Sequence, residues 1–146
     1  VEVEGRKFTV ILREEPEGGY SAQCVEIPGA ISQGENRRQA LTNIREAIEG
    51  YLEAFPEELD QLKRKRELVE ILSEKLPSLS WRKIVKALNK AGFRIVHQRG
   101  SHIYLTNGKH KLTVPRRKTI KKGTLLSTIQ QAGFTRAEFP DLLKKK

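Results

Sequence analysis

The sequence has no methionine, one cysteine and few aromatic residues. The lone Cys24 excludes an intrachain disulfide, and its alternating surroundings predict a small buried hydrophobe. There is no run of about 18 apolar residues, which argues against a transmembrane segment. Residues 1–4 alternate between valine and glutamate, unlike a signal peptide, and the missing methionine indicates that Val1 is not the translated start. We therefore expect a soluble cytoplasmic protein without a membrane partner.

Acidic residues are scarce in the second half of the chain. Residues 77–146 contain 17 lysines and arginines against 2 acidic residues, whereas residues 1–60 contain 6 against 13. This asymmetry, within a total net charge of +10, predicts two units with different partners. The basic unit is expected to bind a polyanion, most obviously nucleic acid. The alternatives are a basic surface that serves only solubility, and an acidic unit that masks the basic one.

The first unit has the pattern of a small α+β domain over residues 1–56. Alternating side chains predict strands over residues 8–13, 20–25 and 30–33, with turn-forming residues between them. Asn36 followed by Gln39 is typical of a capping box that opens a helix. Apolar residues then recur at helical spacing up to Leu52, and Pro56 marks the end of that helix or the start of the next one. Each element has one apolar face, as expected for three strands packed on one helix.

The next stretch, residues 57–77, is predicted to be a helical linker, about 30 Å long if fully formed. The second unit, residues 78–146, begins with Ser80 as the N-cap of a helix that stops at Gly92. Strands are predicted over residues 93–98, 102–106 and 111–114, and another helix starts near Gly123. This αβββα order resembles a double-stranded-RNA-binding domain.

The strand predicted over residues 102–106 follows a turn at Gly100. Its alternation places His102 on the face opposite Ile103 and Leu105, so the histidine face lies open when the apolar face is buried. An imidazole moves protons near neutral pH, and neighbouring cations hold a phosphodiester, as a metal-free ribonuclease requires. His102 is therefore the candidate catalytic residue. The competing interpretation is a surface histidine without chemistry.

Phosphate binding is predicted at the start of the last helix, where lysines meet free backbone amides. Ser101 is expected to be a turn residue, and His97 and His110 to lie on the surface. The three histidines lack a cysteine or aspartate partner pattern, so we predict no metal site and no cofactor. The candidate RNA-binding residues are Lys121, Lys122, Gly123 and Thr124, with Lys111, Arg116 and Arg117 as weaker candidates.

The first unit resembles the HicB antitoxin family over about residues 6–55. The resemblance implies a ribonuclease-H-like fold without nuclease activity. Members often continue into a DNA-binding segment, which is not recognisable here. The resemblance rests on Gly19-Tyr20, Ile27-Pro28-Gly29, Ser32-Gln33-Gly34 and the predicted helix from Gln39 to Leu52.

The second unit resembles the HicA toxin family over about residues 78–139. HicA proteins are messenger-RNA-cleaving ribonucleases inhibited by HicB, and the family's catalytic histidine matches His102. A second histidine, frequent in the family, is replaced here by Arg117, which holds phosphate but cannot take a proton at neutral pH. The motifs are Lys86-Ala87-Leu88, Gly92-Phe93, Gly100-Ser101-His102, Val114-Pro115, Lys122-Gly123-Thr124-Leu125 and Ala132-Gly133-Phe134.

Together these resemblances imply a toxin and its antitoxin in one chain. The second unit would be a latent, metal-independent RNA endonuclease, an mRNA interferase. The substrate's own 2′-hydroxyl would be the nucleophile, and His102 would remove its proton or protonate the leaving oxygen. The acidic first unit would mask it, either within one chain or in an exchanged homodimer, which a stiff linker would favour. The alternative hypothesis is a catalytically inactive RNA-binding or regulatory module, which would tolerate glutamine in place of His102.

Overall fold

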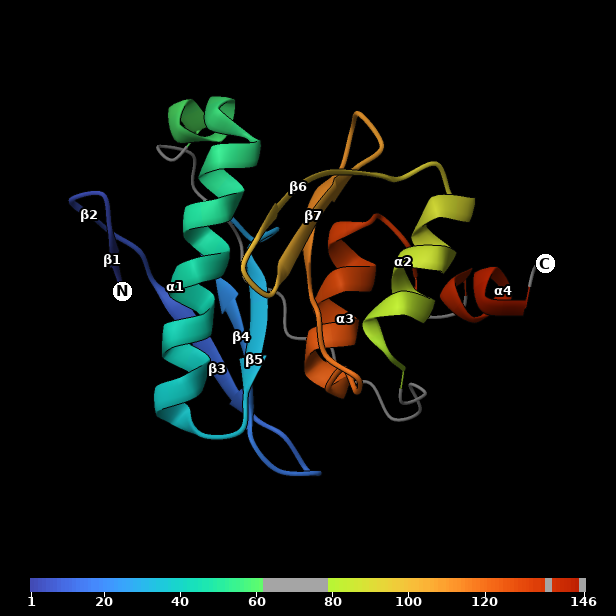
Figure 1. The fold of residues 1–146 in the computed structure, drawn as a ribbon, viewed down its shortest axis with the longest axis horizontal. Coiled ribbons are helices and arrows are strands. Elements are labelled where there is room, and N and C mark those ends of the chain that lie inside the picture. Colours follow the sequence, from blue (N-terminus) through green and yellow to red (C-terminus); the bar gives the residue numbers. More distant parts are fainter. Residues whose placement is uncertain (62–78, 136–137, 145–146) are drawn as a thin grey trace.

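The computed structural model describes residues 1–61, 79–135 and 138–144. Its elements form an α+β arrangement with two three-stranded antiparallel sheets (Figure 1). The predicted order of three strands and a helix in the first unit is confirmed, as is the helix, three strands and helix of the second. The elements of the first unit are β1 (Glu2–Val3), β2 (Arg6–Lys7), β3 (Val10–Glu14), β4 (Tyr20–Cys24), β5 (Ile31–Gly34), α1 (Arg37–Ala54) and the 3₁₀ helix η1 (Pro56–Gln61).

Helix α1 starts where the sequence predicts. The Asn36 side chain accepts a hydrogen bond from the Gln39 amide at 2.8 Å, and the Gln39 side chain accepts one from the Glu35 amide at 2.6 Å. These contacts satisfy two amides near the helix start. One face of α1 then packs on the β3-β4-β5 sheet, and Cys24 is buried in the core between them, as expected.

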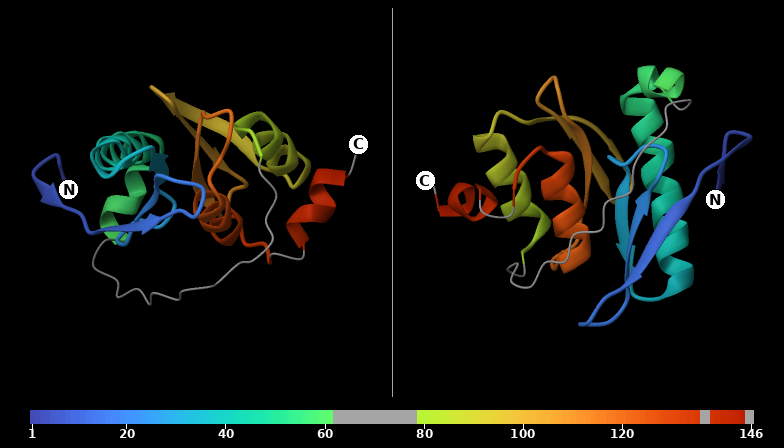
Figure 2. Two further views of the ribbon diagram at one scale, coloured as in Figure 1. Left: turned by 90° about the horizontal axis from the view of Figure 1, so that it is seen from below. Right: turned by 180° about the vertical axis from the view of Figure 1, so that it is seen from behind.

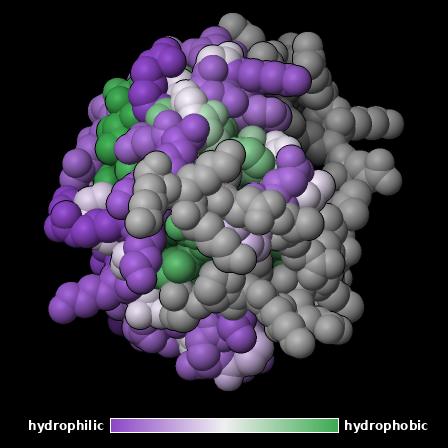
Figure 3. All heavy atoms as spheres, turned by 90° about the vertical axis from the view of Figure 1, so that its right-hand side faces the viewer, coloured by the Kyte–Doolittle hydropathy of each residue, from purple (hydrophilic) through white to green (hydrophobic). Residues whose placement is uncertain are grey.

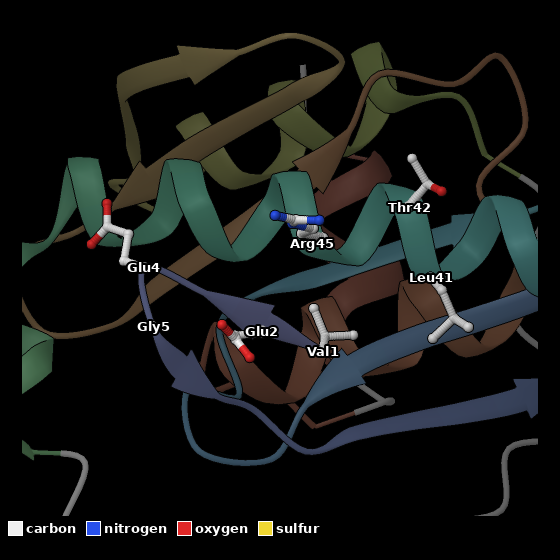
Figure 4. A pocket seen from close by; sticks show the side chains of 7 residues that line it. All are labelled: Val1, Glu2, Glu4, Gly5, Leu41, Thr42 and Arg45. Carbon is white, nitrogen blue, oxygen red and sulfur yellow. The ribbon is translucent and has the colours of Figure 1, made fainter.

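Two features of the first unit and linker differ from the predicted elements. A short β1–β2 hairpin precedes the sheet, and its two-residue strands are too short to leave a periodic pattern. Residues 56–61 form a 3₁₀ helix where an α-helix was predicted from residue 57. The rest of the predicted linker helix lies outside the described residues. A pocket between the hairpin and residues Leu41, Thr42 and Arg45 of α1 contains none of the predicted site residues (Figure 4).

The second unit packs α2 and α3 on one face of its sheet, whose strand order is β6-β7-β8 (Figures 1 and 2). Ser80 caps α2 through the Lys83 amide, as predicted. A short α4, absent from the sequence prediction, packs against α2 through the fully buried Phe139. Its bounds and those of its neighbours are α2 (Trp81–Lys90), β6 (Arg94–Arg99), β7 (His102–Thr106), β8 (Lys111–Pro115), α3 (Lys122–Gln131) and α4 (Glu138–Lys144).

The two faces of the β6–β8 sheet have different neighbours. Ile103 and Leu105 point into the core formed with α2 and α3. The opposite face is covered by α1 and β5 of the first unit, and Tyr104 belongs to the first unit's apolar core (Figures 1 and 2). The end of the molecule that carries α2 and α4 faces away from this contact. Its coloured atoms are mostly hydrophilic around small hydrophobic areas (Figure 3).

Candidate active site

His102 opens β7 immediately after the turn that the sequence predicts. Gly100 in this turn has φ +54°, in the left-handed region that favours glycine. A Cβ on Gly100 would also lie 2.5 Å from Oε1 of Glu46, which belongs to α1. The turn therefore needs glycine twice, for its own backbone conformation and for the close approach of the first unit's carboxylate.

Both ring nitrogens of His102 contact the first unit. Nε2 lies 2.7 Å from the Ser32 hydroxyl on β5, and Nδ1 lies 2.8 Å from Oε1 of Glu46 on α1. The same Glu46 oxygen accepts hydrogen bonds from the amide and the hydroxyl of Ser101, at 3.1 and 3.3 Å. Only 1% of His102 is exposed. The imidazole is thus enclosed between two residues that lie 70 and 56 positions away in the chain.

Burial sets the protonation of this pair. It lowers the pKa of His102 below the ordinary value, with a further lowering from the charge of Arg117, although the Glu46 carboxylate acts in the opposite direction. Partial burial of Glu46 raises its pKa, but hydrogen bonds from His102 and Ser101 outweigh this and lower it overall. Because both pKa values are lowered, we expect a neutral His102 imidazole beside an ionised Glu46 carboxylate. Nδ1–H then donates a hydrogen bond to Glu46, and Nε2 accepts a hydrogen bond from the Ser32 hydroxyl.

Tyr104, two residues along the same face, is inserted against α1. Its hydroxyl donates to the Ala47 carbonyl at 3.0 Å, and none of its surface is exposed. Burial raises the pKa of Tyr104 above its ordinary value. A Cβ on Gly50 would lie 2.1 Å from the Tyr104 hydroxyl oxygen. The absence of a side chain at Gly50 therefore provides the space into which Tyr104 fits.

The predicted phosphate-binding groups meet at the start of α3, and they too contact the first unit. Lys121 is only 6% exposed: its ammonium donates to the Gly18 carbonyl at 2.7 Å, and its amide donates to Oε1 of Gln33 at 2.9 Å. A Cβ on Gly19 would lie 2.8 Å from Nζ of Lys121, so this turn also leaves room for the second unit.

Carboxylates from the β3–β4 turn accept hydrogen bonds from the next two amides. The Gly123 amide donates to Oε1 of Glu15 at 2.7 Å, and the Lys122 amide donates to Oε1 of Glu17 at 3.2 Å. Thr124 contributes its hydroxyl, which lies 3.4 Å from the Ser32 carbonyl. Negative groups at a helix N-terminus are favoured by the unpaired amides and the helix dipole. The start of α3 is therefore occupied by protein carboxylates.

Of the three weaker candidates, Lys111 lies apart from Arg116 and Arg117, which are adjacent in the chain. Lys111 is at the far end of the β7–β8 pair from His102, where its ammonium lies 3.0 Å from Glu57. Arg116 is exposed and stacks on the ring of Trp81. Arg117 is half-buried and close enough for its charge to lower the His102 pKa. Arg117 follows Pro115, the register partner of His102, by two residues, whereas Lys111 pairs with Thr106 at the other end of β7.

Sequence reasoning missed the groups of the first unit that contact the histidine, and also missed Arg99. Arg99 pairs with Glu53 and, at 3.6 Å, with Glu49; His97 lies 3.0 Å from Glu53. The available signal was the spacing of Glu46, Glu49 and Glu53, which places three carboxylates on one face of a helix. Within the described ranges, no three histidine, cysteine, aspartate or glutamate side chains are grouped as a metal site would require. No described helix is long and apolar enough to cross a membrane.

Comparison with known proteins assigns a class to each unit. The model of the HicA toxin of bacterial toxin–antitoxin systems matches residues 81–134. A UPF0150 protein of Thermoplasma acidophilum is 34% identical over 58 residues, which cover 40% of this chain and 84% of the relative. A UPF0150 protein of Synechocystis sp. is 39% identical over 66 residues, which cover 45% of this chain and 84% of the relative. No solved structure gives a significant match.

The chain therefore belongs, through its N-terminal region, to the family of UPF0150 proteins, which are HicB-like antitoxins. Its C-terminal region is a HicA toxin domain, and HicA toxins are known as mRNA interferases. The pair of domains points to a toxin–antitoxin protein with RNA as the substrate class of its toxin.

Proposed function

We propose that this chain is a self-inhibited toxin–antitoxin protein. Its second unit, residues 78–146, is a latent metal-independent RNA endonuclease, and its first unit, residues 1–56, holds that activity off. The observation that carries the proposal is the engagement of both His102 ring nitrogens by Ser32 and Glu46. An imidazole bonded at Nδ1 and Nε2 and 1% exposed has no free site from which to exchange a proton with RNA.

In the released second unit, the 2′-hydroxyl of the RNA attacks the adjacent phosphorus, and the bond from phosphorus to the 5′-oxygen of the next nucleotide breaks. His102 takes the 2′-hydroxyl proton or gives one to the departing oxygen. Lys121, Lys122 and the amide of Gly123 hold the non-bridging phosphate oxygens. Arg117 contributes positive charge near the histidine, and cannot replace a second proton-transferring histidine.

The first unit competes for both parts of this site. Ser32 and Glu46 bind the proton-transfer group, while Glu15 and Glu17 bind the amides expected to hold phosphate. Opposite net charges favour the encounter of the two units. A covalent connection raises the effective concentration of one unit around the other to about millimolar when the linker spans the sites. We propose masking within one chain; the exchanged homodimer is distinguished by sedimentation of the intact protein.

The test opens the contact without altering the proposed catalytic groups. Gly50→Leu in the intact chain places a side chain in the space of the Tyr104 hydroxyl, whereas Thr42→Leu puts the same side chain at an exposed position of α1. We expect little RNA cleavage by the unaltered chain and by Thr42→Leu, and at least about 100-fold more by Gly50→Leu. Adding His102→Ala to Gly50→Leu should abolish that gain, with unchanged circular dichroism.

Two results would contradict the proposal. Equal cleavage by Gly50→Leu with and without His102→Ala would reject His102 as the catalytic group. An opened protein that binds RNA without cleaving it would favour the alternative, a catalytically inactive RNA-binding or regulatory module. Scattering from each variant gives an independent measure of whether the two units have separated.

A further inference from the structure

Helix α1 presents a row of carboxylates to the β6–β7 turn. Glu46, Glu49 and Glu53 are spaced three and four residues apart, so they share one helix face over an axial length of about 10 Å. Each has a partner on the second unit. Glu46 contacts Ser101 and His102, while Glu49 and Glu53 both pair with Arg99. The row thus begins at the candidate catalytic histidine and runs away from it.

Arg99 lies directly beside His102 in the sheet. The two residues are register partners across the β6–β7 pair, and Arg99 extends toward α1 together with His97. Its side chain is 39% exposed even in the closed structure, and its described ion-pair partners are the two glutamates of the first unit. When the first unit leaves, this guanidinium is left beside the histidine with its donor groups free.

A guanidinium binds carboxylate and phosphate with the same planar fork of N–H donors. The groups that hold carboxylates in the closed protein are therefore suited to hold phosphates in the open one. From this we infer that Arg99 is an RNA-binding residue of the second unit, holding a phosphate next to the one at His102, and that the carboxylates of α1 occupy the path of the RNA backbone. His97, two residues before Arg99 on β6, extends the same path.

This inference rests on the proposed function and adds a second phosphate contact to it, on the opposite side of His102 from the start of α3. The carboxylates of α1 then do more than cover the second unit: they occupy the positions that RNA phosphates would take. Binding of the first unit and of RNA at Arg99 is then mutually exclusive, because both require the same guanidinium donors.

The experiment measures RNA affinity on an open protein that does not cleave. The intact chain carrying Gly50→Leu and His102→Ala is titrated with a single-stranded RNA at several salt concentrations. Adding Arg99→Ala should weaken binding about tenfold and lower the log–log salt slope by about one, because one phosphate contact is lost. The matched control is Arg94→Ala, another exposed arginine of β6, which should leave affinity and slope nearly unchanged. Arg99→Lys should retain the slope and recover part of the affinity.

The outcomes separate the inference from the proposed function. Equal binding by the Arg99→Ala and Arg94→Ala proteins would overturn the role of Arg99, while RNA cleavage by the Gly50→Leu protein would still support the proposed ribonuclease. Loss of affinity with an unchanged salt slope in Arg99→Ala would also overturn it, because that result indicates altered folding rather than a lost phosphate contact. Absence of both binding and cleavage in the Gly50→Leu protein would reject the proposed function and this inference together.

Discussion

Both faces of strands β7 and β8 are buried, but by different means, whereas most of β6 is exposed. Under α2 and α3, residues such as Ile103 and Leu105 pack in an apolar core within one unit. Under α1 and β5, the buried groups include His102, Tyr104 and Thr113, and each of these three makes a hydrogen bond across to the other unit. Burial of apolar area is worth about 25 cal/mol per Å² and has no direction, whereas a buried polar group needs a partner at a fixed place.

In the proposed function the polar face is the contact that opens, and this difference supports that proposal. An apolar face released into water loses its stabilisation entirely, but polar groups such as His102 and Thr113 exchange protein partners for water at a modest net cost of about 1 kcal/mol each. Within the described residues, no buried side-chain nitrogen or oxygen lacks a partner. The polar face therefore binds the first unit through partners at fixed places, and its polar groups can be hydrated when the first unit leaves.

The largest expected effect comes from weakening the apolar face. Leu105 has no exposed surface, so Leu105→Ala should lower the free energy of unfolding of the second unit by about 2–5 kcal/mol through the cavity it leaves. Urea denaturation of the intact chain, followed by Trp81 fluorescence, measures this. Thr113→Val on the polar face should cost only about 1 kcal/mol. Equal losses for the two variants would remove the distinction between the faces.

An intermediate effect is expected where the polar face carries charge. Glu46→Gln keeps the shape of the side chain but weakens acceptance from His102 and Ser101. Because Glu46 is partly exposed, we expect a loss of about 1–2 kcal/mol in the contact between the units, and RNA cleavage by the intact chain about tenfold higher. Glu4→Gln, which alters an exposed carboxylate of the β1–β2 hairpin, serves as the control. Unchanged cleavage would show that Glu46 does not hold the cover in place.

The smallest effect concerns pH. Closing the two units lowers the pKa of His102, so the open state binds the proton more readily, and closure is fully favourable only above the ordinary histidine pKa of about 6.5. As pH falls through that value toward the lowered pKa, closure should weaken. The lowered pKa of Glu46 acts in the same direction below about 4.5. Scattering between pH 7.5 and 5 measures the open fraction, and His102→Gln should flatten its dependence above pH 5.

Local patterns predicted the groups that belong to one element. Alternation along β7 placed His102 and Tyr104 on one face, and the spacing of Asn36 and Gln39 located the start of α1. The start of α3 was predicted from its lysines and following amides. These are signals with periods of two to four residues, which a sequence records directly.

The partners of those groups were not predictable from local patterns. Ser32 in a strand and Glu46 on a helix carry no sign that they meet a histidine 70 and 56 residues later. Arg99 was overlooked because its ion pairs are with carboxylates of α1 rather than with its neighbours in sequence. Short elements such as β1 and β2 were missed because two residues give no period. Contacts of this kind depend on how the units pack, which the pattern of either unit alone does not record.

The fit between Tyr104 and Gly50 constrains which proteins can recognise each other. A first unit with any side chain at position 50 collides with the tyrosine hydroxyl, and a second unit with a shorter residue at position 104 leaves a cavity against α1. Substitutions at these two sites are therefore expected to co-vary among relatives, including those whose two units are separate chains. We therefore expect this pair of residues to help determine which first unit binds which second unit.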